Sequence, residues 1–441
     1  MEVSYKKIGT IAYPILISLL MEYLIGLTDT AFLGRVGEVE LGASALGGVF
    51  FTALFVVGIG FSIGAQIMIA RRNGERRLGK IGAILQQGLI FSVVIAGAMI
   101  ALSKAFAPSL LERTIQSEAI FRATVRYLDW RIWGLLFAFV SMMFRAFYVG
   151  TTNTRIMTLN SVVMVLSNVA LNYALIFGRF GFPRMGIAGA AIASTFAEGV
   201  SMLFYILYTR FRLDWRRYKL FSWAGFRPKL LGQMLGLSGF MMIQQFLAVG
   251  TWFIFFLAIE HQGERPLAVT NLVRSLSSVI FLTVNAFAST TNTLVGNLMG
   301  AGSTKQVLPT VWKCAKFSYL CVLPLLVLMA VIPGYVLRVY TNNWELIAAS
   351  VPSLWVMASA YLLSTPGFVY FNAIAGTGNT RQAMWIEIAT LCIYMVFVGY
   401  VVVYKSANVA VCWSSEHVYG GFLFLFSYLY LKRAKWQTKE V

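Results

Sequence analysis

The stretch that decides the fold is PILISLLMEYLIGLTDTAFLG, residues 14–34, which is almost wholly apolar yet carries Glu22 and Asp29. About 20 apolar residues are enough to cross a bilayer as a helix. A carboxylate at membrane depth costs at least about 2.5–3.5 kcal/mol, so such residues usually face a bundle interior or a water-filled path. Asp29 follows Glu22 by about two helical turns, which places both acids on one helix face. The pair predicts a site for a proton, a metal ion or a cationic substrate.

The composition is that of a polytopic membrane protein. The chain has 441 residues, of which 59% are hydrophobic and 12% are charged, whereas soluble domains carry about 25% charged residues. The formal net charge of +19 is typical of Lys and Arg kept on cytoplasmic loops. Because these residues are scattered over short loops, we predict no nucleic-acid partner. The four cysteines lie in apolar runs without a C-x-x-C motif, so no metal or disulfide role is predicted.

About twelve apolar segments long enough to span a membrane follow one another along the chain. With an even number of spans, both termini lie on the same side of the membrane. The loops on that side hold 21 Lys and Arg residues, against eight on the other side. The positive-inside rule therefore predicts cytoplasmic termini and a multi-pass protein of the inner (cytoplasmic) membrane. The expected spans are 8–33, 42–70, 83–107, 123–149, 159–178, 186–209, 231–259, 267–298, 309–335, 348–375, 384–404 and 407–431.

The longest basic link, residues 210–229, separates segment six from segment seven. It predicts an N-terminal six-helix lobe at 1–215 and a C-terminal six-helix lobe at 216–441. Two interpretations of the link stay open. Its Arg, Trp and Tyr residues suit contact with a membrane surface, and they equally suit a solvated connector on the cytoplasmic side.

The two halves share a turn motif. GTTNTR (Gly150–Arg155) follows the fourth segment, and GTGNTR (Gly376–Arg381) follows the tenth, so that the second copy begins 226 residues after the first. Gly, Thr and Asn occur in many turns. Their equal place in each half nevertheless predicts a parallel repeat about an axis along the membrane normal, an arrangement found in transporters.

With these features in place, the chain resembles the MATE (multidrug and toxic compound extrusion) transporters, and within them the DinF-like branch. The resemblance covers essentially the whole chain. It implies an all-α fold of two pseudo-symmetric six-helix bundles around a central V-shaped cavity. It also implies export of amphiphilic or cationic compounds in exchange for H⁺ or Na⁺, without ATP. The motifs that carry it are residues 14–37, 167–181 (SNVALNYALIFGRFG), 186–199 (GIAGAAIASTFAEG), 291–303 (TNTLVGNLMGAGS) and the paired turns.

The resemblance also implies a polar cluster in the N-terminal lobe. The family's helix-one acid falls on Asp29, its helix-five Asn on Asn168, and its helix-six hydroxyl on Ser194, with Thr195 as an alternative. The helix-five Asp of the family is replaced here by Asn172. That departure puts in doubt a sodium site at Asp29, Asn168 and Asn172 copied from relatives.

Two further acids, Glu22 and Glu198, complete the predicted set for cation coupling or substrate binding. Glu198 lies four residues after Ser194, on the same helix face. Each acid either lines the cavity and stands in for the missing carboxylate, or points toward lipid headgroups. The alternatives are that Asp29 is a structural acid hydrogen-bonded to neighbouring backbone, and that the intramembrane Asn residues are interhelical glue. The roles of Glu387, Glu416 and His417 are left open.

The sequence thus predicts a secondary active antiporter, working by alternating access as a monomer among membrane lipids. The alternative is a flippase for lipid-linked oligosaccharides or peptidoglycan precursors, from the same superfamily. Buried acids in the first helix favour the exporter, because a flippase for pyrophosphate-linked lipids needs a cationic cavity. No enzyme motif and no cofactor site is found in the sequence.

Overall fold

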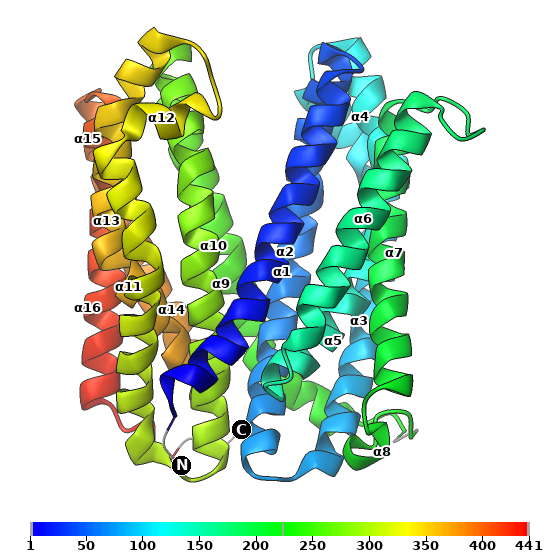
Figure 1. The fold of residues 1–441 in the computed structure, drawn as a ribbon, viewed down its shortest axis with the longest axis vertical. Helices are drawn as coiled ribbons and strands as arrows, with labels where there is room; N and C mark the ends of the chain where they lie inside the picture. The colour runs from blue at the N-terminus through cyan, green and yellow to red at the C-terminus, as the bar shows by residue number, and fades with distance from the viewer. Residues whose placement is uncertain (1–2, 223–224, 439–441) are drawn as a thin grey trace. The chain divides into compact units, whose positions relative to one another are not determined.

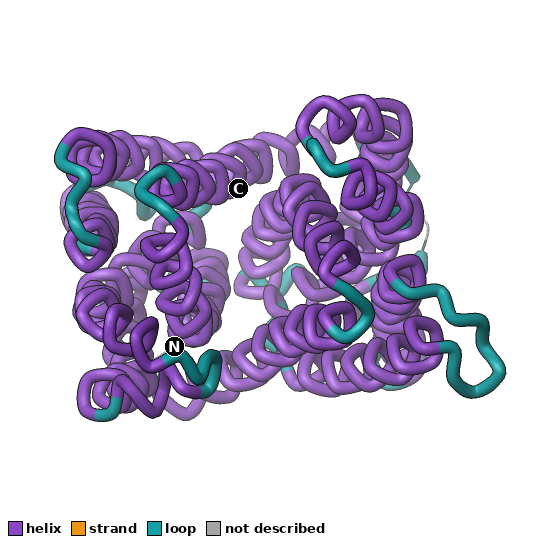
Figure 2. Tube along the Cα trace, turned by 90° about the horizontal axis from the view of Figure 1, so that it is seen from above, coloured by secondary structure: helices purple, strands orange, loops and turns teal. Residues whose placement is uncertain are grey.

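The computed structural model describes residues 3–222 and 225–438. Within these ranges the chain is helical, and no strand occurs. Figures 1 and 2 show long helices packed side by side and joined by loops at their ends. The helices of the first half are α1 (Tyr5–Gly34), α2 (Glu38–Gly74), η1 (Leu78–Lys80), α3 (Ile81–Thr114), α4 (Glu118–Arg131), α5 (Gly134–Gly150), α6 (Arg155–Phe177), α7 (Ile187–Phe211) and the short α8 (Trp215–Tyr218).

The second half continues in the same way. Its helix α13 begins at a cap in which the Asn343 carboxamide oxygen accepts hydrogen bonds from two backbone N–H groups, both at 3.1 Å. The helices are α9 (Pro228–Glu260), α10 (Glu264–Gly300), η2 (Thr304–Gln306), α11 (Val307–Val331), α12 (Pro333–Arg338), α13 (Trp344–Gly376), α14 (Thr380–Val398), the π-helical η3 (Gly399–Tyr404), α15 (Val409–Trp413) and α16 (Ser415–Arg433).

The predicted number of spans is confirmed. Within residues 3–222 and 225–438, eleven helices or helix runs are long and apolar enough to cross a membrane, or twelve if the bent pair α4 and α5 forms one span. The sequence predicted that fourth span as one continuous segment, 123–149. The structure instead bends it by 46° between Arg131 and Gly134. Helix α4 is far more polar than the other long helices, because five of its 14 residues are charged.

The described chain forms two compact units, which divide within α1 and within α9. One unit is Ile17–Met242, and the other is Met1–Leu16 with Ile243–Val441. In the first, α5 packs against α2, α3 and α7, and in the second α13 packs against α10, α11 and α16 (Figure 1). The six-helix lobes predicted at 1–215 and 216–441 describe the two copies of the sequence repeat, and they stay a prediction.

The repeat is visible in the element boundaries. Helix α2 begins at Glu38 and α10 at Glu264, which lies 226 residues later, and both helices are 37 residues long. The 3₁₀ turns η1 and η2, at Leu78 and Thr304, keep the same spacing. Two stretches of unlike sequence therefore form the same local structure at the same interval.

The two turn motifs differ at one position, and both turns have the same backbone conformation there. Thr152 has φ 62°, and Gly378, at the equivalent position, has φ 89°. Each donates its backbone N–H to a carbonyl three residues earlier, at 2.9 Å in both turns. The left-handed conformation is free for glycine and strained for a β-branched threonine. The turn geometry is thus kept even where the glycine is lost.

Close helix packing in the first unit depends on a glycine of α2. A Cβ atom built on Gly64 would lie 2.1 Å from Ser238 Oγ and 2.7 Å from Ser238 Cα on α9. The Ser238 hydroxyl itself donates to the Phe61 carbonyl at 3.1 Å. Small residues that let backbones approach are a main source of helix association in membranes.

We expect Gly64→Ala to lower the melting temperature of the purified protein in detergent. The added methyl would force α2 and α9 apart and break the Ser238 hydrogen bond. Gly48→Ala is the matched control, because it lies on the same helix and a methyl group added there would meet no atom within 4 Å. Equal melting temperatures for the two variants would contradict the packing argument.

Candidate functional site

Four of the six predicted residues form one hydrogen-bonded cluster inside the first unit. The Asp29 carboxylate on α1 accepts a hydrogen bond from Asn172 Nδ2 at 2.5 Å and one from Ser194 Oγ at 2.8 Å. Asn172 Nδ2 also donates to Asn168 Oδ1 at 3.0 Å, and Asn168 Nδ2 donates to Ser194 Oγ at 3.1 Å. The bonds form a closed ring, in which every member touches two others.

Helix geometry brings these side chains together. Asn168 and Asn172 are four residues apart on α6 and therefore stand on one face, where α6 packs against α7. Both asparagines are fully buried, and Ser194 on α7 is 5% exposed. Burying a polar group is costly unless it is hydrogen-bonded, and the ring provides partners for all of these side-chain polar atoms except Asn172 Oδ1.

Asp29 is the one member of this ring whose side chain can gain or lose a proton. When Asp29 is ionised, Asn172 and Ser194 both donate to it. When it is protonated, its hydroxyl needs an acceptor, and a serine hydroxyl can donate or accept. Asn172 Nδ2 can only donate. Ser194 is therefore the partner that lets the ring hold either form of Asp29.

The same ring is less suited to a metal ion. Hard cations take oxygen ligands, yet the amide nitrogen of Asn172 faces both Asp29 and Asn168. Asn172 Oδ1 is buried and makes no hydrogen bond, so it is the one ring oxygen with no donor. Among the described residues there is also no group of three His, Cys, Asp or Glu side chains that could hold a metal ion.

Glu198, the fifth predicted residue, is held in an ion pair instead. Its two carboxylate oxygens accept hydrogen bonds from Arg131 Nη2 at 2.7 Å and Nη1 at 3.0 Å. The two side chains are only 9% and 12% exposed. The Arg131 guanidinium also lies 3.7 Å from the centre of the Phe51 ring, a cation–π contact. Arg131 was missed in the sequence, although it falls inside the predicted span 123–149.

This ion pair sits at the bend between α4 and α5. Thr195, next to Ser194 on α7, donates to the Trp130 carbonyl at 3.1 Å. A Cβ on Gly134 would lie 2.2 Å from Glu198 Oε2. Only glycine therefore lets α5 begin directly beside the ion pair. One face of α7 thus contacts the Asp29 ring through Ser194 and the bend through Thr195 and Glu198.

Glu22, the sixth predicted residue, also has an arginine partner. Its Oε1 accepts from Arg145 Nη1 on α5 at 2.8 Å and from the Ser18 hydroxyl at 3.3 Å. The Glu22 side chain is 40% exposed. Within the described chain, neither Glu22 nor Glu198 makes a hydrogen bond to the Asp29 ring.

The acids of the second unit have tyrosine partners. Tyr419 donates to Glu387 Oε1 at 2.9 Å, and Tyr394 donates to Glu416 Oε1 at 3.3 Å. Glu387 is 1% exposed, and its Oε2 atom has no hydrogen-bond partner. No salt bridge of either acid occurs in the described ranges. His417 Nε2 lies 3.0 Å from the Ser359 hydroxyl.

Together these features define a polytopic membrane protein with repeated helical halves and, in the first of them, a partly buried carboxylate, Asp29, held in a ring of hydrogen bonds. The MatE family model matches residues 14–174 and again 241–401. The chain belongs to the MatE family. This membership confirms the predicted family and the prediction of a transporter rather than an enzyme.

The similar proteins agree with this family. A probable multidrug resistance protein NorM of Idiomarina loihiensis is 24% identical over 406 residues, covering 90% of this chain and 86% of the relative. A probable NorM of Thermotoga maritima is 24% identical over 453 residues, covering 99% and 94%. A solved structure described as an outward-facing multidrug resistance MATE transporter of the MOP superfamily superposes with a TM-score of 0.89 at 17% identity, covering 97% and 95%. The likeness to that structure confirms the predicted fold class.

Proposed function

We propose that this protein exports amphiphilic or cationic compounds across the inner membrane by alternating access, in exchange for protons. The names of the NorM relatives, probable multidrug resistance proteins, support the substrate class. The observation that carries the coupling is the Asp29 carboxylate, held by Asn172 and Ser194 inside the first unit. We also propose cytoplasmic termini, a monomer, and membership of the DinF-like branch.

The choice of proton over sodium rests on the hydrogen bonds of the ring. A proton on Asp29 needs only the Ser194 hydroxyl to turn from donor to acceptor. A sodium ion would need the Asn172 amide to turn its oxygen toward Asp29, at the cost of two hydrogen bonds. The proton therefore requires the smaller rearrangement of the buried ring.

In this proposal Glu198 and Glu22 do not bind the coupling proton. Both are paired with arginines, so each pair is close to neutral as a whole. We propose that the pairs stabilise the helices around the ring, and that Asp29 alone binds the coupling proton. Glu198 would then not replace the carboxylate that Asn172 lacks.

Transport in proteoliposomes tests the coupling. We expect ethidium efflux to follow an imposed pH gradient and to be unaffected by an imposed Na⁺ gradient at constant pH. The gradient-free vesicle and the protein-free vesicle are the two controls. Efflux that follows the Na⁺ gradient alone would overturn proton coupling while leaving the exporter proposal intact.

The flippase alternative is tested in cells and in the same proteoliposomes. The arginines that lie within the spans near the ring, Arg131 and Arg145, are both neutralised by glutamates, which does not favour a pyrophosphate-linked lipid. Cells that express the protein should gain resistance to ethidium. Transfer of a lipid-linked pyrophosphate between leaflets, without ethidium efflux, would support the flippase instead.

A further inference from the structure

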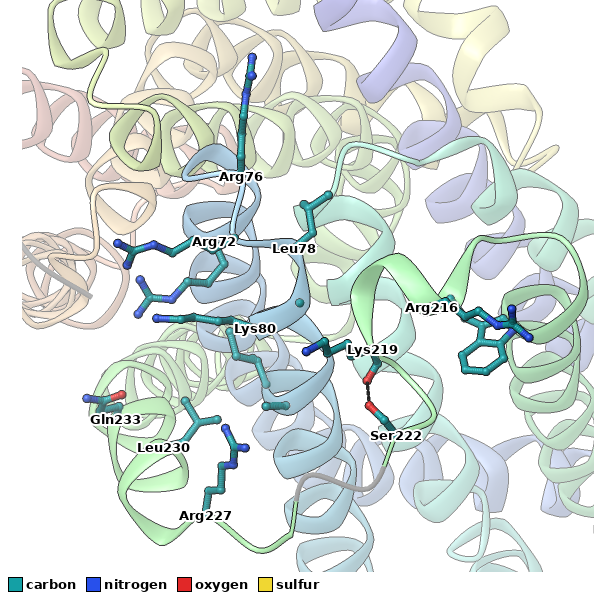
Figure 3. A pocket seen from close by; sticks show the side chains of 15 residues that line it. Arg72, Arg76, Leu78, Lys80, Arg216, Lys219, Ser222, Arg227, Leu230 and Gln233 are labelled. Carbon is teal, nitrogen blue, oxygen red and sulfur yellow. Dashed lines mark hydrogen bonds between the residues drawn. The ribbon is translucent and has the colours of Figure 1, made fainter.

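A strongly basic pocket lies in the first unit, where α2 ends, η1 and α3 begin, and the connector from α7 leads through α8 to α9. Its volume is about 1010 Å³. Figure 3 shows side chains from α2, from η1, from the connector and from the start of α9 around this space. The basic residues that line it are Arg72, Arg76, Arg77, Lys80, Arg216, Lys219 and Arg227.

The connector that closes the pocket is fixed to α3. The Gln87 side chain donates to the Gly225 carbonyl at 2.8 Å and accepts from the Arg227 backbone N–H at 3.0 Å. A Cβ on Gly82 would lie 2.2 Å from the Lys219 carbonyl, so the connector backbone lies directly on α3. The pocket is therefore a built feature of the unit.

The charges around the pocket are poorly balanced. No acid lines it among the described residues. Glu75 pairs with Arg72 at 2.9 Å and with Arg77 at 3.5 Å. Asp214 caps α8, where it accepts from a backbone N–H at 3.4 Å. Several cations that share one concavity repel one another and focus a positive potential there. An anion with several oxygen acceptors would relieve this repulsion.

The surroundings point to a lipid as the source of that anion. The pocket is lined by the end of α2, the start of α3 and the start of α9, and all three helices are long and apolar enough to cross a membrane. A pocket at the ends of spans is expected to lie near the headgroup region of the bilayer. On the same connector, Phe221 is 45% exposed and Phe226 is 60% exposed. Aromatic side chains next to basic ones are typical of the headgroup region.

We propose that this pocket binds the phosphate of an anionic phospholipid headgroup. Lys80 of η1 and Lys219 and Arg227 of the connector supply the positive charge, and Phe221 and Phe226 contact the acyl chains. The lipid would hold the connector between the two halves against the first unit. The proposal does not depend on drug export or on the coupling ion.

Thermal unfolding of the purified full chain in detergent tests the proposal. Phosphatidylglycerol is added to one sample, phosphatidylcholine to a second and inorganic phosphate to a third. We expect phosphatidylglycerol alone to raise the melting temperature of the wild type. We expect Lys80→Gln/Lys219→Gln to lose that rise and Lys80→Arg/Lys219→Arg to keep it.

The matched control removes two positive charges predicted for the same membrane side, in the other unit. Lys305→Gln/Arg381→Gln should keep the full rise with phosphatidylglycerol. If the control loses the rise in melting temperature as fully as Lys80→Gln/Lys219→Gln does, the lipid acts only by general attraction to the positive charge of the protein. That result would overturn the proposed site. An equal rise with inorganic phosphate would show a site for free phosphate and would overturn the lipid.

Discussion

Replacing Asp29 by asparagine is expected to abolish ethidium efflux driven by a pH gradient, while drug binding to the purified protein changes by less than about threefold. Asparagine has nearly the shape of aspartate, so the fold around Asn172 and Ser194 should persist. It cannot bind or release a proton near neutral pH, however. If Asp29 is the coupling group, the variant retains its binding surface and loses the link to the gradient. Efflux in proteoliposomes and fluorescence binding in detergent measure the two quantities separately.

Two further variants sharpen this test. Glu22→Gln removes another carboxylate of α1, one that is paired with Arg145 and lies outside the ring. It should keep proton-driven efflux, even if the protein becomes less stable. Ser194→Ala should slow efflux without uncoupling it, because the ring loses the hydroxyl that can both donate and accept. An Asp29→Asn variant that transports at the wild-type rate under a pH gradient would refute the coupling role.

Much of the fold could be predicted from the sequence, because a membrane span is a local property of about 20 residues. The ring could also be predicted, since Asn168 and Asn172 share a helical face and the family resemblance supplied Asp29 and Ser194. The orientation of the Asn172 amide, and so the direction of its hydrogen bonds, could not be predicted. A side-chain amide has a donor and an acceptor end, and the sequence does not say which end faces the carboxylate.

The ion pairs of Glu22 and Glu198 mark the limit of the prediction. Arg131 and Glu198 are 67 positions apart, and Arg145 and Glu22 are 123 apart. Two arginines and two glutamates within the same spans can pair in two ways, and only the packing of α4, α5 and α7 selects one. The available signal was that the predicted span 123–149 holds both Arg131 and Arg145, and a buried acid in another span is expected to pair with such an arginine.

The largest loss of stability is expected from Arg131→Met. This change leaves the Glu198 carboxylate buried at 9% exposure without its partner. Breaking a buried ion pair by removing one member typically costs about 3–5 kcal/mol, because the remaining charge is left uncompensated. Methionine keeps most of the length of the arginine side chain, so little of the loss should come from a cavity. Thermal unfolding in detergent should show a large fall in the melting temperature.

A double-mutant cycle separates the charge from the packing. Arg131→Met combined with Glu198→Leu removes both charges, and buried pairs replaced by apolar residues of similar size often lose little stability. We therefore expect the double variant to be more stable than Arg131→Met alone. Arg122→Met is the matched control on α4, because the Arg122–Glu118 pair is 78% and 69% exposed and exposed pairs contribute about 0–1 kcal/mol. A double variant as unstable as the sum of its single changes would mean that Arg131 and Glu198 act independently, and that the bend between α4 and α5 is held by packing alone.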